Sequence, residues 1–461
     1  MIQWLRQKRF KTLENLNNLQ NMTFGGVIII KTIYPTNGEM LRLMRRYRNC
    51  KQSTLAIELN VTRSLISQYE NNEIPCPDHI LVSSKHILDM EYLPTCESDN
   101  DEYEDMLNKL FDLISEDKLN EAEVYREKLS VIRVFPHEKN FNTLFSLHEC
   151  RLLFRLNKVD EGKAILSTYE NIMYSLNDIQ KYYYYFNEGT YNLKISCIDI
   201  ASQSYKKALK LRIDMHDNHR ALKYNIAYCD ATLGFVSLSI VSVKEVCKSY
   251  PKGKDKSLLF WSQNLLGNLY TCIGILSSSE KANDKAYEIA LEKYERNRNE
   301  ESKLFLGSAN FGYGYMYRRA KKYKLSKEYF DKAIDMIPKT HNNYLEALFH
   351  KSCCCIEMKN TSSCLPLISE GLKLSKNKKS YNLAFKGLEI VANPNEDSAK
   401  ELEEKILPLL LKANSIQYVL YFATFLSDYY KARGQGFLTR SYKMSELAMS
   451  IYKKCLEGSE I

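Results

Sequence analysis

A pattern of small and aromatic residues in the middle of the chain limits the fold more than any other feature of the sequence. In a frame of 34 residues that begins at Gly307, such residues recur at positions 8, 11, 20, 24, 27 and 32, namely Gly314, Tyr317, Ser326, Phe330, Ala333 and Pro338. In a pair of antiparallel helices, small residues at these positions let the helices approach, aromatic rings fill the gap between them, and proline ends the second helix. The spacing therefore predicts a helix pair that buries its apolar face only by stacking on further pairs.

Two other segments fit the same frame. One has Gly189, Ala201, Tyr205 and Ala208 at positions 8, 20, 24 and 27. The other has Trp261, Leu265, Gly267 and Tyr270 in its first helix and, after a few extra loop residues, Tyr287 and Ala290 in its second. Weaker helical periodicity predicts further pairs, at about 106–131, 139–171, 219–249, 342–375, 380–413 and 415–455.

The frame resembles the tetratricopeptide repeat. The resemblance implies a right-handed superhelix whose concave surface is lined by the first helix of each pair. Only 10 Pro and 17 Gly occur in 461 residues, so few residues interrupt helices. The sequence predicts an all-α protein, with the repeats occupying residues 106–461.

Residues 52–70 have a different pattern, that of two short helices joined by a tight turn. Their apolar residues, which two crossed helices would share as a core, are Leu55, Leu59, Val61, Ile66 and Tyr69. Asn60 is expected to adopt the left-handed backbone conformation at the turn, and Thr62 to cap the second helix. With a first helix from Gly38 and a closing helix over 79–91, residues 38–91 are predicted to form a helix-turn-helix domain.

The polar residues of this domain predict a DNA-binding surface. The candidate DNA-binding residues are Gln52, Thr62, Arg63, Ser64, Ser67, Gln68 and Asn71. The stretch from Glu39 to about Pro77 resembles the phage-repressor-like class (XRE or Cro/CI type). The resemblance implies that Gln52 contacts a phosphate, while Arg63, Ser64 and Gln68 contact base edges. The alternative is that the motif serves only as a packing or dimerisation element.

Three other features complete the N-terminal part. The first helix carries Arg42, Arg45, Arg46 and Arg48, which are expected either near the phosphate backbone or on a solvated helix face. Residues 1–37 are interpreted either as a basic arm or as a leader before a wrongly chosen start, with Met22 or Met40 as the true initiator. Residues 92–105 are acidic and lack apolar periodicity, which predicts a linker.

The predicted first helices of the repeats carry asparagine at several places, although asparagine is a poor helix former. The candidate peptide-binding residues are Asn187, Asn225, Asn264, Asn268 and Asn310. An asparagine amide can donate to one backbone carbonyl and accept from one backbone N–H, so a row of them can hold an extended peptide. The alternative at each position is a solvated surface residue.

No pattern points to catalysis, a metal or a cofactor. The sequence has no phosphate-binding glycine-rich loop and no metal-ligand spacing among its 13 Cys and 8 His, so an enzyme is not expected. The consecutive Cys353, Cys354 and Cys355 are interpreted as free thiols, with a redox sensor as the alternative. The absence of an 18-residue apolar run and of a signal-peptide core predicts a cytoplasmic protein. The net charge of +9 favours a polyanionic partner.

A phage-repressor-like domain followed by a long tetratricopeptide array resembles the RRNPP family of peptide-responsive regulators (Rap, Rgg, NprR, PlcR, PrgX). The resemblance implies a quorum-sensing transcription factor that binds double-stranded operator DNA and a short signalling peptide, typically as a homodimer. It would also place the family's asparagine clamp among Asn225, Asn264, Asn268 and Asn310. The alternative is a repeat scaffold that binds a partner protein and uses its DNA-binding domain only for autoregulation.

Overall fold

The computed structural model describes residues 36–48, 50–88, 100–116, 118–130, 139–211, 213, 219–250 and 256–457. Within these ranges the chain forms helices and no strand, which confirms the all-α prediction. The chain divides into two compact units, one of Met1–Cys96 with Glu127–His137 and the other of Glu97–Arg126 with Glu138–Ile461. Residues 1–35, which hold almost all of the predicted N-terminal extension, lie outside the described residues.

The smaller unit contains the predicted helix-turn-helix. Its described helices are α2 (Asn37–Tyr47), α3 (Gln52–Glu58), α4 (Arg63–Glu70) and α5 (Asp78–Ile87). Asn60 has a φ of 54°, and the Thr62 hydroxyl accepts the Leu65 N–H at 3.2 Å at the start of α4. Both local predictions are confirmed. The core of this unit contains Leu41, Met44, Leu55, Ala56, Ile66, Tyr69, Ile80 and Leu81.

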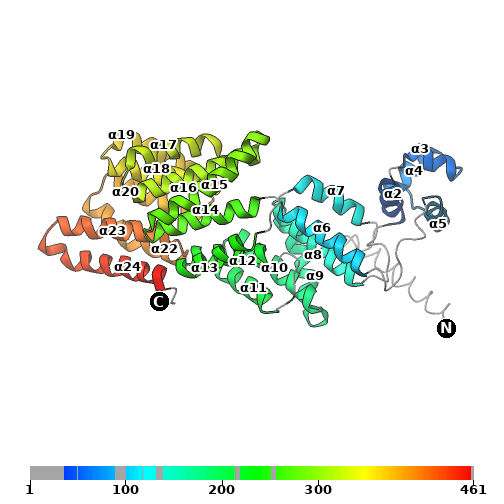
Figure 1. Cartoon of the computed structure of the whole chain (residues 1–461), viewed down its shortest axis with the longest axis horizontal. Coiled ribbons are helices and arrows are strands. Elements are labelled where there is room, and N and C mark those ends of the chain that lie inside the picture. Colours follow the sequence, from blue (N-terminus) through cyan, green and yellow to red (C-terminus); the bar gives the residue numbers. More distant parts are fainter. Residues whose placement is uncertain are drawn as a thin grey trace. The chain divides into compact units, whose positions relative to one another are not determined.

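The larger unit is a succession of antiparallel helix pairs (Figure 1). The first helices of the pairs are α6 (Asn100–Ser115), α8 (Lys139–Arg155), α10 (Asp178–Lys194), α12 (Arg220–Thr232), α14 (Ser257–Cys272), α16 (Glu300–Arg319), α18 (Asn342–Glu357), α20 (Lys379–Ala392) and α23 (Ile416–Ala432). Their partners are α7 (Leu119–Leu129), α9 (Val159–Glu170), α11 (Ile198–Lys210), α13 (Val236–Lys248), α15 (Leu276–Arg296), α17 (Tyr323–Met336), α19 (Thr361–Leu374), the continuous run α21 (Glu396–Glu401), η5 (Leu402–Ile406) and α22 (Leu407–Lys412), and finally α24 (Leu438–Glu457). Short 3₁₀ turns, η4 (Met173–Ser175) and η6 (Gln435–Phe437), precede α10 and α24.

The residues of the 34-residue frame pack as predicted. A Cβ added to Gly314 would lie 2.8 Å from the ring of Phe330, and the Ser326 hydroxyl donates to the Gly314 carbonyl at 2.7 Å. The same relation holds in the earlier unit, where a Cβ on Gly189 would lie 2.6 Å from the Tyr205 ring. Glycine is therefore required here because an aromatic ring occupies the space that a side chain would fill.

The prediction for the third unit was wrong in its second helix. No extra loop follows the first helix, because only Ile273–Ile275 separate α14 from α15. Counted from Gly267 at position 8, positions 20 and 24 are Ser279 and Asn283 rather than residues near Tyr287. The Ser279 hydroxyl donates to the Gly267 carbonyl at 2.9 Å, and a Cβ on Gly267 would lie 2.2 Å from Asn283 Oδ1. A polar Asn283 thus replaces the usual aromatic ring.

The boundary predicted for the acidic linker also needs correction. Helix α6 begins at Asn100, so residues 100–105, with the acidic Asp101, Glu102, Glu104 and Asp105, belong to a helix instead of a linker. The apolar residues that α6 buries in the core begin only after the acidic stretch. They are Leu107, Leu110, Phe111 and Ile114. Because the first turns of α6 are charged and lack apolar periodicity, the sequence pattern did not reveal where the helix begins. Residues 92–99, the rest of the predicted linker, lie outside the described residues.

Distant repeats of the larger unit contact each other through the C-terminal helix. Helix α24 packs on α13, and the Ser237 hydroxyl donates to the Leu456 carbonyl at 2.6 Å (Figure 1). Lys454 lies 4.7 Å from the centroid of the Phe235 ring. The Asn414 amide, just before α23, donates to Asp199 of α11 at 3.0 Å. We call these contacts the closing contacts; they join segments more than 200 residues apart in sequence.

Candidate functional site

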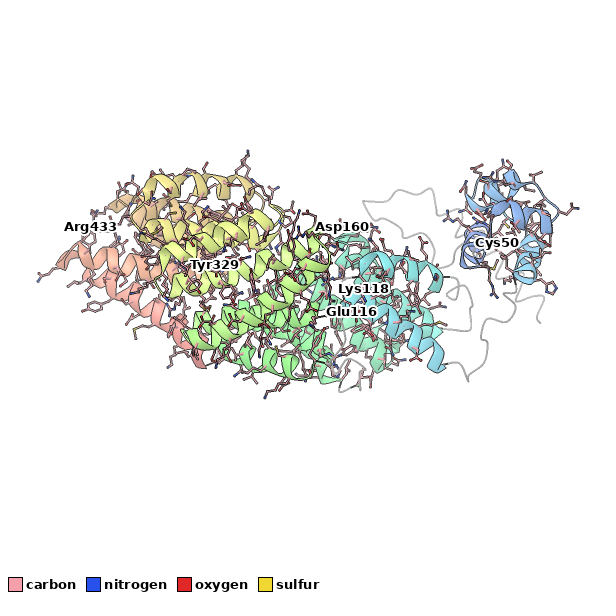
Figure 2. All side chains as sticks on the ribbon, turned by 45° about the horizontal axis from the view of Figure 1, so that its top comes forward. Cys50, Glu116, Lys118, Asp160, Tyr329 and Arg433 are labelled. Carbon is pink, nitrogen blue, oxygen red and sulfur yellow. The ribbon has the colours of Figure 1, made fainter. Side chains whose placement is uncertain are left out.

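A buried ion pair organises the helix-turn-helix unit. The Arg45 guanidinium of α2 donates to both oxygens of Glu70 at 2.5 and 2.7 Å, and the Gln52 amide donates to the same carboxylate at 2.9 Å. A further Arg45 N–H donates to the carbonyl of Cys50, which Figure 2 labels in this unit. The side chains of Arg45 and Glu70 are only 12% and 2% exposed. The expectation that Arg45 lies on the phosphate-facing or solvated face is therefore wrong.

The candidate reading residues lie on the outside of this unit. Arg63 and Ser64, in the first turn of α4, are exposed, and their side chains have no hydrogen-bond partner among the described residues. Thr62 and Asn71 are exposed at the two ends of α4, while Ser67 and Gln68 are half-buried. None of these side chains belongs to the core, so the fold leaves them available to a partner.

A basic cleft lies beside the reading residues. Its volume is about 500 Å³, and it is lined by Arg45, Lys51, Gln52, Ser53 and Arg63. Since Glu70 neutralises Arg45, the free positive charge of the cleft comes from Lys51 and Arg63. A polyanion that contacts the start of α3 would meet both cations.

In the larger unit, several helices converge on the carboxylate of Glu346 in α18. The Tyr418 hydroxyl donates to it at 2.7 Å and the Gln417 amide at 3.0 and 3.2 Å, both from α23. Burial raises the pKa of Glu346, although its hydrogen-bond donors oppose the shift. Burial and this carboxylate together raise the pKa of Tyr381, from α20, well above its usual range.

Tyr228 extends this group of side chains to α12. It lies on α12 and is 42% exposed, yet burial, followed by the charge of Glu346, raises the pKa of its phenol. The Tyr228 phenol is thus close enough to Glu346 to feel its charge, which places this face of α12 on the same side of the unit as α18. We call the side of the unit that carries Tyr228, Glu346, Tyr381 and Tyr418, from α12, α18, α20 and α23, the inner surface.

A second group on the inner surface joins Arg318 of α16 to His350 of α18. Arg318 Nη1 lies 3.1 Å from His350 Nδ1, and because arginine can only donate, the imidazole nitrogen accepts. The other ring nitrogen, Nε2, lies 3.9 Å from Glu346. The Tyr421 ring of α23 lies 5.1 Å from the Arg318 guanidinium. Sequence reasoning missed all of these residues, because they come from three helices and form no motif.

The five candidate asparagines fall into two groups. Asn187, Asn264 and Asn310 are buried, and their amides donate to the carbonyls of Leu147, Ser308 and Leu306. Asn225 and Asn268 are half-buried. The buried group ties helices to each other or to their own preceding turn. A peptide clamp therefore remains a prediction chiefly for the half-buried Asn225 and Asn268. Among the described residues, Oδ1 is buried without a partner in both Asn268 and Asn187.

The consecutive cysteines are unsuited to redox sensing. Cys353, Cys354 and Cys355 are buried, and every cysteine that the structure describes is free of disulfide bonds. Burial raises the pKa of all three thiols, that of Cys353 to about 12. Reactive thiols need the opposite shift, so these residues act as apolar core residues.

The neutral His350 predicts a pH effect on stability. Burial, and then the charge of Arg318, hold the pKa of His350 well below its usual range. The unfolded chain protonates this group near pH 6.5 while the folded chain does not, so stability falls as the pH drops below about 6.5. The free energy of unfolding, measured in urea at pH 7.0, 6.0 and 5.5, should therefore depend on pH. His350→Gln should lower the slope of this free energy against pH by up to about 1.4 kcal/mol per pH unit. An unchanged slope would show that His350 is not held neutral.

Comparison with known protein families and with curated proteins finds no match to the chain. Solved structures do match. A Rap protein complexed with Competence and Sporulation Factor has a TM-score of 0.68 at 15% identity, covering 78% of this chain and 100% of the Rap chain. NprR in complex with its cognate peptide NprX has a TM-score of 0.60 at 16% identity, covering 76% of this chain and 99% of the NprR chain. The apo form of the quorum sensor NprR from B. thuringiensis has a TM-score of 0.58 at 16% identity, covering 76% of this chain and 99% of the NprR chain.

These matches establish the fold of the part of the chain that they cover. The repeat unit has the tetratricopeptide-like architecture of Rap and NprR, so the resemblance to this group of quorum sensors is confirmed at the level of the fold. Among the described residues, no helix is both long and apolar enough to cross a membrane.

Proposed function

We propose that this protein is a cytoplasmic transcriptional regulator whose helix-turn-helix unit binds operator DNA and whose inner surface binds a short signalling peptide. The observation that carries the proposal is the presence, in one chain, of an exposed polar reading helix and of a repeat unit with the fold of NprR. Two of the similar structures, those of Rap and NprR, were solved with Competence and Sporulation Factor and with the peptide NprX.

The DNA-binding part rests on α4 and the basic cleft. Arg63 and Ser64 are exposed at the start of α4, where a helix inserted in the major groove meets base edges. Lys51 and Arg63 supply positive charge for the adjacent phosphates. A homodimer would present two such helices to a palindromic operator, and we propose this arrangement. Neither proposal gives the protein an enzymatic activity.

The experiment begins with operator selection from random double-stranded DNA by the full-length protein, followed by gel-shift titration. Arg63→Ala should weaken binding to the selected operator by about 10- to 100-fold and relax the base preference at one position of each half-site. Arg48→Ala, at an exposed arginine directly after α2, should weaken binding to all sequences equally and reduce its salt dependence. If Arg63→Ala leaves the base preference unaltered, the assignment of the reading helix is wrong.

A further inference from the structure

One cation of the inner surface lacks an anionic partner. Arg318 Nε is buried without a hydrogen-bond partner, and within the described ranges no carboxylate oxygen lies within 4.0 Å of the Arg318 guanidinium. Arg45 differs in this respect, because its guanidinium donates to both carboxylate oxygens of Glu70. Placing a guanidinium in a partly desolvated site without a counter-charge is costly, so its retention requires an explanation.

The immediate neighbours of Arg318 satisfy it only in part. His350 accepts one of its five N–H donors, and the Tyr421 ring stabilises the charge through a cation–π contact. Tyr421 and Arg318 are both half-buried, so neither residue is fully enclosed by the described part of the chain. The donors that remain suit the two oxygens of a carboxylate.

Glu346, on the other side of His350, does not fill this role. Glu346 already accepts hydrogen bonds from Tyr418 and Gln417, and the ring of His350 lies between Glu346 and the guanidinium. The inner surface therefore presents an acid whose oxygens already accept hydrogen bonds and, beside it, a cation without a counter-charge.

We propose that Arg318 binds a carboxylate of the ligand that enters the inner surface. Because this inference rests on the proposed function, the ligand is a short peptide, and the carboxylate is either its C-terminus or an acidic side chain. Pairing with Arg318 would place that carboxylate beside Tyr421 and His350, in a desolvated site where charge-assisted hydrogen bonds are strong.

The test uses the full chain and three synthetic hexapeptide libraries. The first lacks Asp and Glu and has a free C-terminus, the second is the same with a C-terminal amide, and the third is amidated but carries one Asp at each position in turn. Peptides retained by the protein are identified by mass spectrometry, and the best of each library is measured by calorimetry. If the best peptide of the first library binds at least 10-fold tighter than the best of the second, the C-terminal carboxylate is the partner of Arg318. If the best peptide of the third library binds at least 10-fold tighter than the best of the second, an acidic side chain is the partner.

The variants assign the effect to one residue. Arg318→Gln should abolish the advantage of carboxylate-bearing peptides, while Arg319→Gln, which removes the same charge from the exposed neighbouring residue, should preserve it. Equal binding of all three libraries to the unaltered chain would overturn the role of Arg318 and leave peptide binding intact. Failure of all three libraries to bind would overturn both this inference and the proposed function.

Thermal unfolding separates this role from a purely structural one. Since Arg318→Gln removes a partly desolvated charge without a counter-ion, the melting temperature should stay the same or rise. A marked fall in melting temperature, with the preference for carboxylate retained, would show that Arg318 only supports the packing of α16, α18 and α23.

Discussion

Replacing Glu70 with alanine should unfold most of the helix-turn-helix unit while the repeat unit remains folded. The substitution leaves the Arg45 guanidinium buried without its carboxylate and removes the acceptor for Gln52. Breaking a buried ion pair in this way costs about 3–5 kcal/mol. That is comparable with the whole stability of a domain of about 50 residues. Hydrogen exchange on the full chain should show loss of protection in α2 to α5 only.

Two matched variants test the reason for this effect. Glu73→Ala removes an exposed carboxylate three residues away and should change stability by less than about 0.5 kcal/mol. The double variant Arg45→Met with Glu70→Leu should recover most of the loss, because it leaves no unpaired charge. Equal protection in Glu70→Ala and Glu73→Ala would contradict the assigned role of the pair.

Replacing Phe330 with alanine should destabilise the repeat unit by about 3–5 kcal/mol. The Phe330 ring is fully buried between α16 and α17, against Gly314 and 5.8 Å from the Phe311 ring. Because helix pairs in a repeat array stabilise their neighbours, the cavity should weaken the pairs on both sides. The midpoint of urea unfolding, followed by circular dichroism, measures the change.

Phe330→Leu provides the control for this cavity, since it keeps most of the buried volume and should cost less than about 1.5 kcal/mol. Tyr329, the next residue, is half-buried and lies on α17 as labelled in Figure 2. Tyr329→Ala should have a much smaller effect than Phe330→Ala. Comparable losses in the two alanine variants would mean that the ring of Phe330 is not the one that fills the gap between helices.

The features predicted correctly from sequence depend on short-range chemistry. Asn60 and Thr62 act on the backbone within three residues, and the contact of Gly314 with Phe330 follows from a spacing inside one helix pair. The third unit was misaligned because Asn283 occupies the position of an aromatic ring, and the nearest aromatic residue, Tyr287, suggested a longer loop.

The residues of the inner surface could not be predicted from sequence, because they come from segments that are far apart in the chain. Arg318, His350 and Tyr421 lie on three different helices, and each is unremarkable in its own helix. The asparagines drew attention as poor helix formers, yet Asn187 and Asn310 serve mainly to satisfy backbone carbonyls. Composition within one helix does not distinguish an amide that binds a ligand from one that binds a neighbouring turn.

The closing contacts change how the repeat unit can lose its structure. A linear array frays from its last pair inwards, and each pair that opens leaves the others as they were. Here α24 is both the last helix and a neighbour of α13, through Ser237 and Leu456. Fraying of the C-terminus therefore uncovers the centre of the array as well. The last pair and the middle of the array therefore lose their packing together, so unfolding of the repeat unit should be more cooperative than that of a linear array.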